Sequence, residues 1–320
     1  MPTVLLSAPY MIPSLSRFQP VFDHYGLQTI IPEVHERLSE EQILAYAGQF
    51  DGTLCGDDRY SRRVLERCAP RLKVIAKWGT GVDSIDREAA AELGVALRNT
   101  PNAFTLPVAD TVMGYLLAFV RKQPWMDRAV KAGVWEKIPG RSLSECTLGV
   151  IGVGNIGKAV IRRARPFGMK VLATDIVPIA PDFIVEMGVE MTSLEDLMRR
   201  ADFVSVNCDL NPTSYHIINA NSLSWMKPSA VLVNSARGPL VDEPALVAAL
   251  QSGGIAGAAL DVFEVEPLPA DSPLLHLDNV MLAPHNSNSS PAAWERVHWN
   301  TIRNLIEGLG MDSSALAQFH

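Results

Sequence analysis

Residues 148–157 read LGVIGVGNIG, an apolar run that leads into three glycines spaced as G-x-G-x-x-G. A helical stretch and a second apolar run follow, and the second run ends in an acid. In a strand–turn–helix unit of this kind, Gly152 permits the tight turn, Gly154 lets the backbone approach a pyrophosphate, and Gly157 lets helix and strand pack closely. Free N–H groups at the start of the helix favour an anion there. The sequence therefore predicts a dinucleotide site.

The acid that ends the second apolar run, 170–174, is Asp175. A carboxylate at this point can accept hydrogen bonds from the adenosine ribose, and it would repel a 2′-phosphate. Residues 176–178 read IVP, so no arginine stands next to the acid to hold such a phosphate. The pattern favours NAD as the cofactor. The alternative is that Asp175 only caps the turn.

The bulk composition bounds the class of protein. With 320 residues the chain is too long for one ordinary core, which suggests two domains. Apolar residues make up 48% and charged residues 20%, as in a globular protein. The net charge is −7 and no block of Lys or Arg occurs, so we expect no nucleic-acid partner.

The sequence carries no sign of a membrane segment or an export signal. Its longest strongly apolar stretch, about 112–120, is too short to span a bilayer, and the N-terminus reads as a strand rather than as a signal peptide. The four cysteines are scattered without a CxxC motif, which is typical of reduced thiols; they are Cys55, Cys68, Cys146 and Cys208. We expect a cytoplasmic protein without a membrane partner, and we expect no metal site.

Apolar runs of strand length alternate with helical patterns along almost the whole chain. In the first third the expected strands are 4–7, 28–31, 52–55, 72–76 and 95–97. From residue 147 onward six more are expected, at 148–151, 171–174, 203–206, 230–234, 257–261 and 280–283. Such alternation is typical of parallel sheets with helices on both faces. The sequence thus predicts an α/β fold, in which six strands suffice for a doubly wound dinucleotide domain.

The glycine turn opens the second α/β unit rather than the first. A long apolar helix, expected at 106–121, precedes it, and a helix expected at 290–309 follows the last strand. The second helix is expected to return to the first unit. We therefore predict a cofactor domain, 102–284, that is inserted into a discontinuous substrate domain, 1–101 and 285–320.

Three successive strand ends carry side chains suited to acid–base chemistry. Ligands of open α/β sheets bind beyond the carboxyl ends of the strands, and here those ends are followed by Arg237, by Glu264 and Glu266, and by His285. Reduction of a 2-oxo acid needs a hydride and a proton, and a histidine can supply the proton near neutral pH. A paired carboxylate raises the pKa of that histidine. An arginine can clamp the substrate carboxylate.

Each of these residues also has a plainer interpretation. An arginine at a strand end is usually part of a surface salt bridge, and the two glutamates could be solvated loop acids. Most of the other histidines are expected to be surface or packing residues; they are His24, His35, His216, His276, His298 and His320. The combination at consecutive strand ends, after a dinucleotide motif, favours the catalytic interpretation.

The sequence resembles the D-isomer-specific 2-hydroxyacid dehydrogenases over almost its whole length. The stretches that carry the resemblance are GTGVDSID at 79–86, GVGNIG at 152–157, NSARG at 234–238, DVFEVEP at 261–267 and APH at 283–285. The resemblance implies two doubly wound domains, with a Rossmann NAD-binding domain inserted into a flavodoxin-like substrate domain. It also implies NAD-dependent interconversion of a 2-oxo acid and its D-2-hydroxy acid, and a homodimer.

The same resemblance implies roles for single residues. Arg237 would clamp the substrate, His285 would be the acid/base group, and Glu266 would be its partner. Backbone N–H groups of the 79–81 loop would face the substrate carboxylate. The expected substrate residues in this loop and beside it are Trp78, Gly79, Thr80 and Gly81, and Lys77 and Trp294 could shape the same end.

The resemblance also implies contacts with NAD beyond the glycine turn. Asp261 is expected near the nicotinamide carboxamide, and Thr111 near the nicotinamide end. The full set of expected contacts outside the glycines is Thr111, Asn155, Ile156, Asp175, Asn207, Cys208, Ser235, Ala236, Arg237, Asp261 and His285.

Two stretches depart from the family's pattern. Members commonly carry a Val-Pro-Leu-Thr loop under the adenine, where this chain reads CDLN at 208–211. After His285 many members have glycines or small apolar residues, where this chain reads NSNSS at 286–290. That polar run either hydrogen-bonds a polar substrate or starts a helix before Pro291.

The substrate and one alternative function stay open at this point. Hydroxypyruvate, glyoxylate and a phosphorylated three-carbon acid are the usual substrates by resemblance. Formate dehydrogenases fit less well because they have glutamine where Glu266 stands, and phosphite dehydrogenases because they use lysine where this chain has Thr80. The alternative function is that of an NAD(H)-sensing, corepressor-like binding protein with the same fold.

Overall fold

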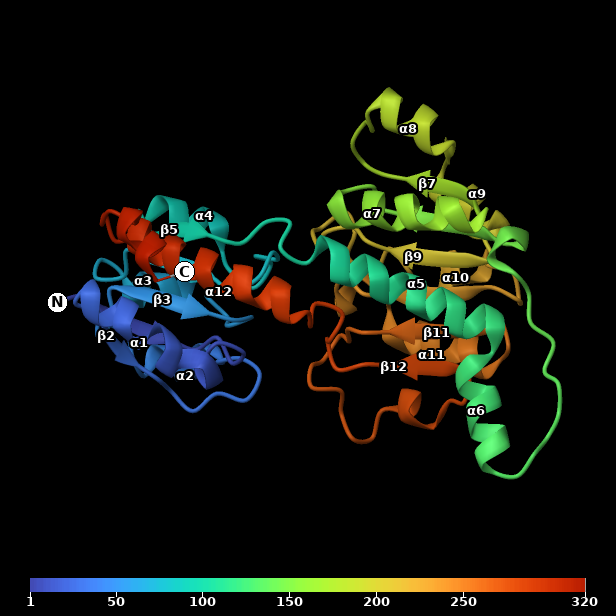
Figure 1. The fold of residues 1–320 in the computed structure, drawn as a ribbon, viewed down its shortest axis with the longest axis horizontal. Helices are drawn as coiled ribbons and strands as arrows, with labels where there is room; N and C mark the ends of the chain where they lie inside the picture. Colours follow the sequence, from blue (N-terminus) through green and yellow to red (C-terminus); the bar gives the residue numbers. More distant parts are fainter. Residues whose placement is uncertain (320) are drawn as a thin grey trace. The chain divides into compact units, whose positions relative to one another are not determined.

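The computed structural model describes residues 1–319, and the chain divides into two compact units (Figure 1). Unit 1 consists of Met1–Phe104 together with Ser290–His320, and unit 2 is Thr105–Ser289. The limits expected from the sequence, 101 and 284, lie a few residues earlier. Each unit is a parallel β-sheet with helices packed against it, which is the α/β fold expected from the alternation of elements.

Unit 1 contains a five-stranded sheet in the order β2-β1-β3-β4-β5, and all neighbouring strands are parallel. The strands are β1 (Thr3–Leu6), β2 (Gln28–Ile30), β3 (Gly52–Cys55), β4 (Val74–Lys77) and β5 (Ala96–Arg98). The helices are α1 (Leu15–His24), α2 (Glu40–Leu44), α3 (Arg62–Cys68), α4 (Arg87–Glu92) and α12 (Pro291–Gly308). All five strands lie where the sequence predicts them, with small shifts at their ends.

Helices cover both faces of the unit 1 sheet, so its central strands are buried on both sides. Every residue of β3 and β4 is buried. Ile43, Val64 and Ala89 bring α2, α3 and α4 into one core cluster with Ile75 of β4. On the opposite face α12 packs so closely that a Cβ on Gly52 would lie 2.7 Å from Leu305. The C-terminal helix therefore belongs to the core of unit 1.

Unit 2 contains a seven-stranded parallel sheet in the order β12-β11-β10-β9-β6-β7-β8. The strands are β6 (Thr147–Ile151), β7 (Lys170–Thr174), β8 (Val189–Met191), β9 (Phe203–Val206), β10 (Val231–Asn234), β11 (Gly257–Leu260) and β12 (Val280–Leu282). The helices are α5 (Thr105–Arg121), α6 (Gln123–Lys131), α7 (Asn155–Ala164), α8 (Pro181–Met187), α9 (Leu194–Arg200), α10 (Ala220–Ser224) and α11 (Glu243–Gln251). Short 3₁₀ turns in the two units are η1 (Ile12–Ser14), η2 (Leu143–Glu145), η3 (Arg165–Phe167), η4 (Gly238–Leu240), η5 (Pro273–His276) and η6 (Ser314–Gln318).

Six strands of unit 2 are those that the sequence predicts, and β8 is an addition. β8 has three residues at the edge of the sheet, and only Val189 among them is buried. It therefore lacks the apolar run by which a buried strand is recognised. α7 begins at Asn155, inside the glycine motif at 152–157.

The strand order of each unit reverses inside its sheet. The reversal lies between β1 and β3 in unit 1 and between β6 and β9 in unit 2. Doubly wound sheets bind ligands at such a point, beyond the carboxyl ends of the strands. In unit 2 this edge carries the glycine turn after β6 and the polar strand ends of β10, β11 and β12.

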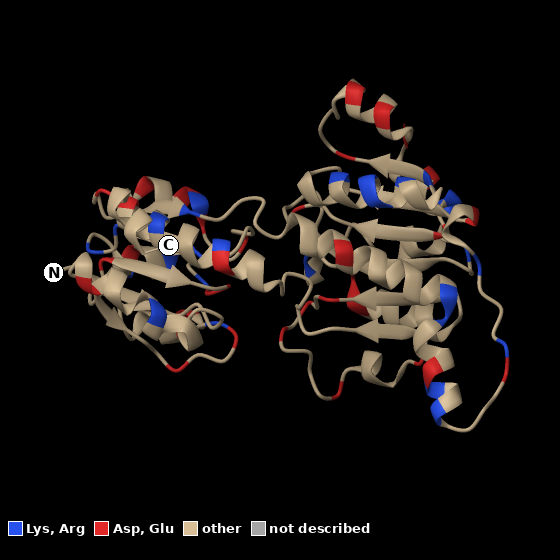
Figure 2. Ribbon diagram, viewed as in Figure 1, with Lys and Arg blue, Asp and Glu red and all other residues tan. Residues whose placement is uncertain are grey.

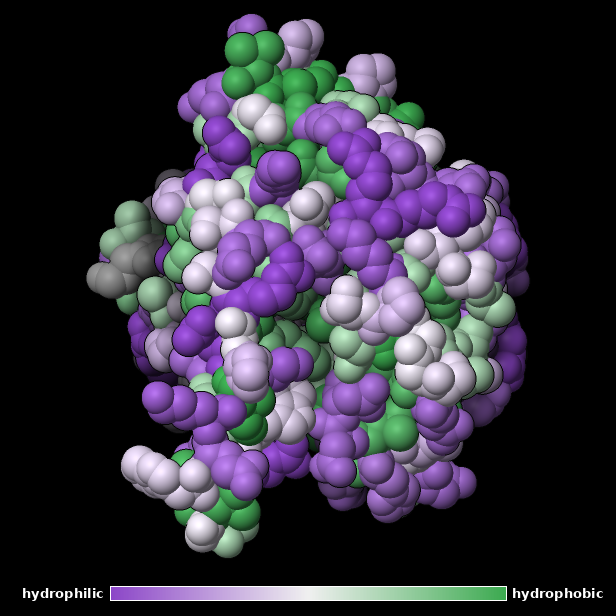
Figure 3. Space-filling model, turned by 90° about the vertical axis from the view of Figure 1, so that its right-hand side faces the viewer, coloured by the Kyte–Doolittle hydropathy of each residue, from purple (hydrophilic) through white to green (hydrophobic). Residues whose placement is uncertain are grey.

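A segment of unit 2, residues 123–142, follows α5 and is called the arm below. α5 ends at Arg121, and Lys122 then takes a left-handed φ of 56° before α6 runs in a new direction (Figure 1). Residues 134–142 after α6 form neither helix nor strand. Four apolar side chains of the arm are exposed, namely Val130, Val134, Trp135 and Ile138. Figure 3 shows one face of the molecule, on which apolar residues are scattered among polar ones. Neither α6 nor the segment after it was among the expected elements.

Charged residues of both signs are interspersed over the helices and loops of each unit (Figure 2). Within residues 1–319 no three His, Cys, Asp or Glu side chains are grouped so that they could hold a metal ion. None of the helices in that range combines the length and the apolar character needed to cross a membrane.

Candidate active site

The glycine turn expected to bind a dinucleotide joins β6 to α7. Gly152 has a φ of +88°, and a Cβ placed on it would lie 2.5 Å from the backbone nitrogen of Cys208. A Cβ on Gly157 would lie 2.1 Å from the carbonyl oxygen of Gly152. By contrast, apart from Gly154 itself and its two neighbours in the chain, no residue in 1–319 has an atom within 4 Å of a Cβ placed on Gly154. The turn itself thus requires glycine at positions 152 and 157, while Gly154 borders open space.

The first turn of α7 faces this open space with its backbone. The helix begins at Asn155 and Ile156, and no side chain in the described part of the chain caps its N-terminus at Gly154. The first N–H groups of an α-helix have no acceptor within the helix, and the helix dipole makes this end partly positive. A pyrophosphate therefore fits the turn, because it needs donors, positive potential and room for close approach.

Asp175 lies at the end of β7, beside the glycine turn. Its Oδ2 accepts the Val153 N–H at 2.6 Å, and its Oδ1 accepts the Val177 N–H at 3.0 Å. These bonds fix the carboxylate and show that Asp175 does cap the turn. A carboxylate offers about four acceptor sites, so its role as a cap leaves acceptor capacity for ribose hydroxyls.

Three further residues that are expected to contact NAD lie on the ends of strands or on α5. The Asn207 N–H donates to the Ile151 carbonyl at 2.7 Å, which holds the end of β9 beside the turn. Burial raises the pKa of the Cys208 thiol to about 11, so this thiol stays protonated at neutral pH. Thr111 lies on α5, where its hydroxyl donates to the Pro107 carbonyl at 3.1 Å.

The end of β10 forms a tight turn that carries Arg237. Asn234 fixes the turn, because its Nδ2 donates to the Arg237 carbonyl at 2.8 Å and its Oδ1 accepts the Ala236 N–H at 3.1 Å. The Ser235 hydroxyl is buried and has no hydrogen-bond partner among the described residues. A buried hydroxyl without a partner is costly, so a bound molecule that hydrogen-bonds Ser235 fits this edge.

Asp261, at the end of β11, is fully buried and holds the segment after β12. Its Oδ1 accepts the Asn286 N–H at 2.7 Å, its Oδ2 accepts the Ser287 N–H at 2.8 Å, and its carbonyl accepts the His285 N–H at 2.7 Å. These bonds keep His285 in a left-handed conformation with a φ of +50°. In the polar run 286–290, Ser290 accepts the Ala293 N–H and is the N-cap of α12, which confirms the helix-start interpretation for that residue.

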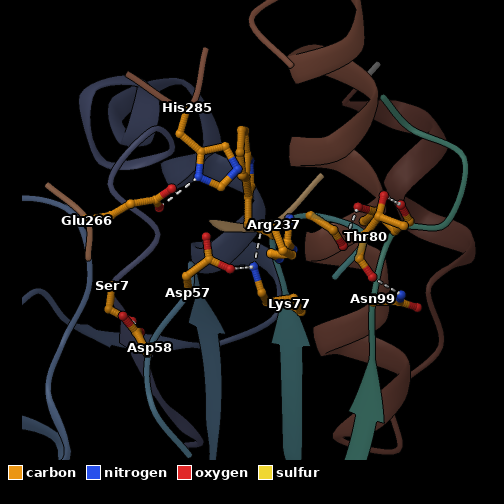
Figure 4. A network of polar contacts seen from close by, with 12 residues as sticks. Ser7, Asp57, Asp58, Lys77, Thr80, Asn99, Arg237, Glu266 and His285 are labelled. Atoms are coloured by element: carbon orange, nitrogen blue, oxygen red, sulfur yellow. Dashed lines mark hydrogen bonds and ion pairs between the residues drawn. The ribbon is translucent and has the colours of Figure 1, made fainter. Parts of the chain in front are cut away.

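Glu266 and His285 face each other from neighbouring strand ends of unit 2 (Figure 4). The His285 Nδ1 lies 3.0 Å from the Glu266 Oε2, and about a fifth of each side chain is exposed. The second oxygen of Glu266 accepts the Phe263 N–H at 2.9 Å, which fixes the carboxylate plane. The imidazole is therefore held through its Nδ1 by the Glu266 carboxylate.

In unit 1 the loop 79–81 follows β4, and residues just after β5 hydrogen-bond two of its carbonyl groups. Gly79 has a φ of +133°, and its carbonyl accepts both the N–H and the hydroxyl of Thr100 at 2.9 Å. The Asn99 side chain donates to the Thr80 carbonyl at 2.6 Å (Figure 4). In a trans peptide the N–H points opposite to the carbonyl. The N–H groups of Thr80 and Gly81 therefore point away from β5, as a carboxylate-binding loop requires.

Lys77 and Trp78 support this loop from below. Lys77 is 2% exposed, and its Nζ lies 2.9 Å from the Asp57 Oδ1 and donates to the Trp78 carbonyl at 3.3 Å. The buried Trp78 indole donates to His298 Nδ1 at 3.0 Å, and burial lowers the pKa of His298, so its neutral ring can accept this bond. Trp294 packs against Trp78 with ring centroids 5.9 Å apart.

One polar pair near the site was missed by sequence reasoning. His216, expected among surface or packing residues, binds Glu264 through its Nε2, and about a quarter of each side chain is exposed. Glu264 was expected either with the functional acids or as a solvated acid. The two residues are far apart in the sequence, so no local pattern could have paired them.

Comparisons with known proteins agree with this geometry. Residues 113–287 match the family model for the D-isomer specific 2-hydroxyacid dehydrogenase, NAD binding domain. The chain is 42% identical over 244 residues to the glyoxylate reductase of Korarchaeum cryptofilum, covering 74% of this chain and 73% of that protein. It is also 42% identical over 266 residues to the D-3-phosphoglycerate dehydrogenase of Methanocaldococcus jannaschii, covering 82% of this chain and 50% of that one.

A solved structure extends the likeness to three dimensions. D-lactate dehydrogenase from Aquifex aeolicus, complexed with NAD and lactic acid, is 28% identical to this chain, with a TM-score of 0.82 and coverage of 94% and 93%. The dinucleotide turn, the strand-end residues and these likenesses lead to one conclusion: the chain belongs to the D-isomer-specific 2-hydroxyacid dehydrogenase family and is an NAD-dependent oxidoreductase.

Proposed function

We propose that this chain interconverts a 2-oxo acid and its D-2-hydroxy acid, with His285 as acid/base group, Glu266 as its partner and Arg237 as substrate clamp. The observation that carries the proposal is the contact of 3.0 Å between His285 Nδ1 and Glu266 Oε2. It lies at the carboxyl edge of the unit 2 sheet, where the turn after β10 also carries Arg237. NAD, when bound at the glycine turn, would exchange a hydride with the substrate carbon.

In the direction of reduction, His285 is the proton donor. With Nδ1 held by Glu266, the proton on Nε2 is the one that moves to the substrate carbonyl oxygen. The Glu266 carboxylate stabilises the imidazolium before transfer, so the proton is available near neutral pH. In the direction of oxidation the same nitrogen accepts the proton of the hydroxyl group.

The substrate carboxylate would be held by groups that are already fixed. Arg237 offers a planar guanidinium suited to two parallel hydrogen bonds. The turn that carries it is held by Asn234. Groups fixed before the substrate binds lose little entropy when it does.

The experiment that tests this proposal is a substrate panel. Oxidation of NADH and NADPH is followed with glyoxylate, hydroxypyruvate, 3-phosphohydroxypyruvate and pyruvate. We expect turnover with at least one acid and a preference for NADH, because Asp175 would repel a 2′-phosphate. Cofactor binding without turnover on any acid would instead favour the alternative, an NAD(H)-sensing binding protein.

Replacing Glu266 with glutamine should move the pH profile of reduction. Without the negative charge next to Nδ1, the imidazolium is less stable and loses its proton at lower pH. The basic limb of kcat is therefore expected to shift to lower pH by on the order of one unit. The measurement is kcat against pH, with Glu186→Gln on the exposed face of α8 as the control. An unshifted limb would remove Glu266 from the pair.

We further propose that the chain is a homodimer and that the arm contributes to its interface. Trp135 is 89% exposed, and three other apolar residues are exposed on the same segment. An exposed patch of this kind on a folded chain usually marks an interaction surface, and aromatic residues dominate the energy of such interfaces.

Replacing Trp135 with glutamate should weaken that dimer by about tenfold or more. The measurement is mass by light scattering over a dilution series, starting from a monomer of 34.9 kDa. Val185→Glu is the control, because Val185 is 81% exposed but lies on α8. A wild-type chain that stays monomeric at all concentrations would contradict the proposal.

A cytoplasmic location is proposed from the thiols. The four cysteines are free, and Cys55, Cys68 and Cys146 are buried. Burial raises the pKa of Cys68 to about 11 and raises that of Cys146 as well. Such thiols are protonated and unreactive, as in proteins of a reducing compartment.

A further inference from the structure

His216 lies next to the turn that carries Arg237. Its backbone N–H donates to the Pro239 carbonyl at 2.9 Å, and its own carbonyl accepts the Asn219 Nδ2 at 2.8 Å. These bonds hold His216 in a left-handed conformation with a φ of +49°. Tyr215 stacks on the imidazole with ring centroids 4.0 Å apart. The ring is therefore fixed beside η4, which starts directly after Arg237.

The imidazole of His216 reaches from this turn to the next loop. Its Nε2 binds the Oε1 of Glu264, which stands two residues before Glu266. The Glu264 N–H donates to the Glu243 Oε2 at 3.3 Å, so a second carboxylate lies close by. Burial, with the Glu264 carboxylate as a further cause, raises the pKa of Glu243. The His216 ring therefore contacts a loop at which two carboxyl groups lie close together.

The loop that His216 holds is the one that presents Glu266 to His285. The Phe263 N–H donates to the Glu266 Oε1, and the Oε2 of the same carboxylate contacts His285. The loop also lies directly on the Arg237 turn, because a Cβ on Gly238 would lie 1.9 Å from the carbonyl carbon of Phe263. A shift of residues 263–264 would therefore move both the partner of His285 and the support of Arg237.

We propose that the His216–Glu264 pair positions Glu266 against His285, so that His216 is a positioning residue of the reaction. This inference rests on the proposed function, in which Glu266 stabilises the imidazolium of His285. Without His216, the Glu264 carboxylate stands beside that of Glu243 and turns outward to water. The backbone of the 263–266 loop would move with the Glu264 side chain, and the distance between Glu266 and His285 would increase.

A double-mutant cycle of His216 and Glu266 distinguishes a positioning role of His216 from a general loss of stability. We expect His216→Ala to lower kcat for reduction by about tenfold and to shift the basic limb of the pH profile downward, as Glu266→Gln does. KM for NADH should change less than about twofold, because residues around the glycine turn are untouched. In a Glu266→Gln background, the same His216→Ala change should have almost no further effect on kcat.

Two further variants test whether the effect of His216→Ala arises only from impaired folding. His216→Gln keeps a donor for Glu264 and should recover most of the lost kcat. Glu264→Gln should reproduce the effect of His216→Ala in part, because it weakens the same contact without changing size. His276→Ala, at an exposed histidine of η5, is the control. Thermal unfolding of every variant shows that the compared chains are folded.

The outcomes distinguish this inference from the proposed function. If His216→Ala lowers kcat equally in both backgrounds and leaves the pH profile in place, His216 is only structural and the inference is overturned. If Glu266→Gln itself changes neither kcat nor the pH profile, the Glu266–His285 pair is wrong, and the inference is overturned with it. Loss of the His216 effect in the Glu266→Gln background supports both.

Discussion

Replacing His285 with alanine is expected to lower the turnover number for 2-oxo acid reduction by about a hundredfold or more. The variant removes the group whose Nε2 would deliver the proton to the substrate carbonyl. It also removes the ring that Glu266 holds at 3.0 Å. The measurement is the steady-state rate of NADH oxidation at saturating substrate.

A second variant excludes backbone strain as the cause. His285 has a φ of +50°, a conformation in which alanine is less comfortable than asparagine. His285→Asn therefore keeps the local backbone and removes only the titrating ring, and it should lose turnover to a similar extent. NADH binding, followed by fluorescence, should persist in both variants. Near-normal turnover in either would contradict the assignment of His285 as the acid.

Replacing single glycines of the turn should separate cofactor binding from folding. A Cβ on Gly154 meets no atom of residues 1–319 within 4 Å apart from those of Gly154 and its two chain neighbours, so Gly154→Ala should fold normally. The new methyl group would fill the space where a pyrophosphate must approach the backbone. We expect the affinity for NADH to fall on the order of a hundredfold, with an unchanged melting temperature.

Gly157→Ala is expected to lower the melting temperature of the protein, unlike Gly154→Ala. Its Cβ would lie 2.1 Å from the Gly152 carbonyl oxygen, so α7 must move away from the turn. Overpacking of this kind costs about 1–3 kcal/mol, which corresponds to a melting temperature lower by roughly 3–10 °C for a unit of this size. Calorimetry and NADH titration of the two variants are the measurements. Unchanged NADH affinity in Gly154→Ala would place the pyrophosphate elsewhere.

Much of the fold could be predicted because parallel strands leave a strong signal. Strands that are covered on both faces consist of unbroken apolar runs, and 203–206 and 231–234 are fully buried. β8 was not predicted from the sequence because two of its three residues are exposed. The arm was not predicted because several of its apolar residues, above all Trp135, are exposed and do not pack in the core of unit 2.

The proximity of Glu266 and His285 could also be expected from the sequence alone. Both follow neighbouring strands of a parallel sheet, and parallel strands bring their carboxyl ends to one edge. Strand order and chain order coincide here, since β10, β11 and β12 are consecutive in both. A reader of the sequence could therefore place Arg237, Glu266 and His285 together without seeing a contact.

By itself, then, the sequence determined the α/β class, the central dinucleotide turn with Asp175, and the edge at which the acid–base residues meet. The class and the turn follow from the periodicity and spacing of residues within single elements, and the shared edge follows because parallel strands bring their carboxyl ends together. Only the tertiary structure decided that Asp261 binds the backbone of Asn286 and Ser287, and that His216 reaches Glu264. Such contacts join loops that are distant in the sequence, so their geometry depends on how the loops pack and no local pattern records it.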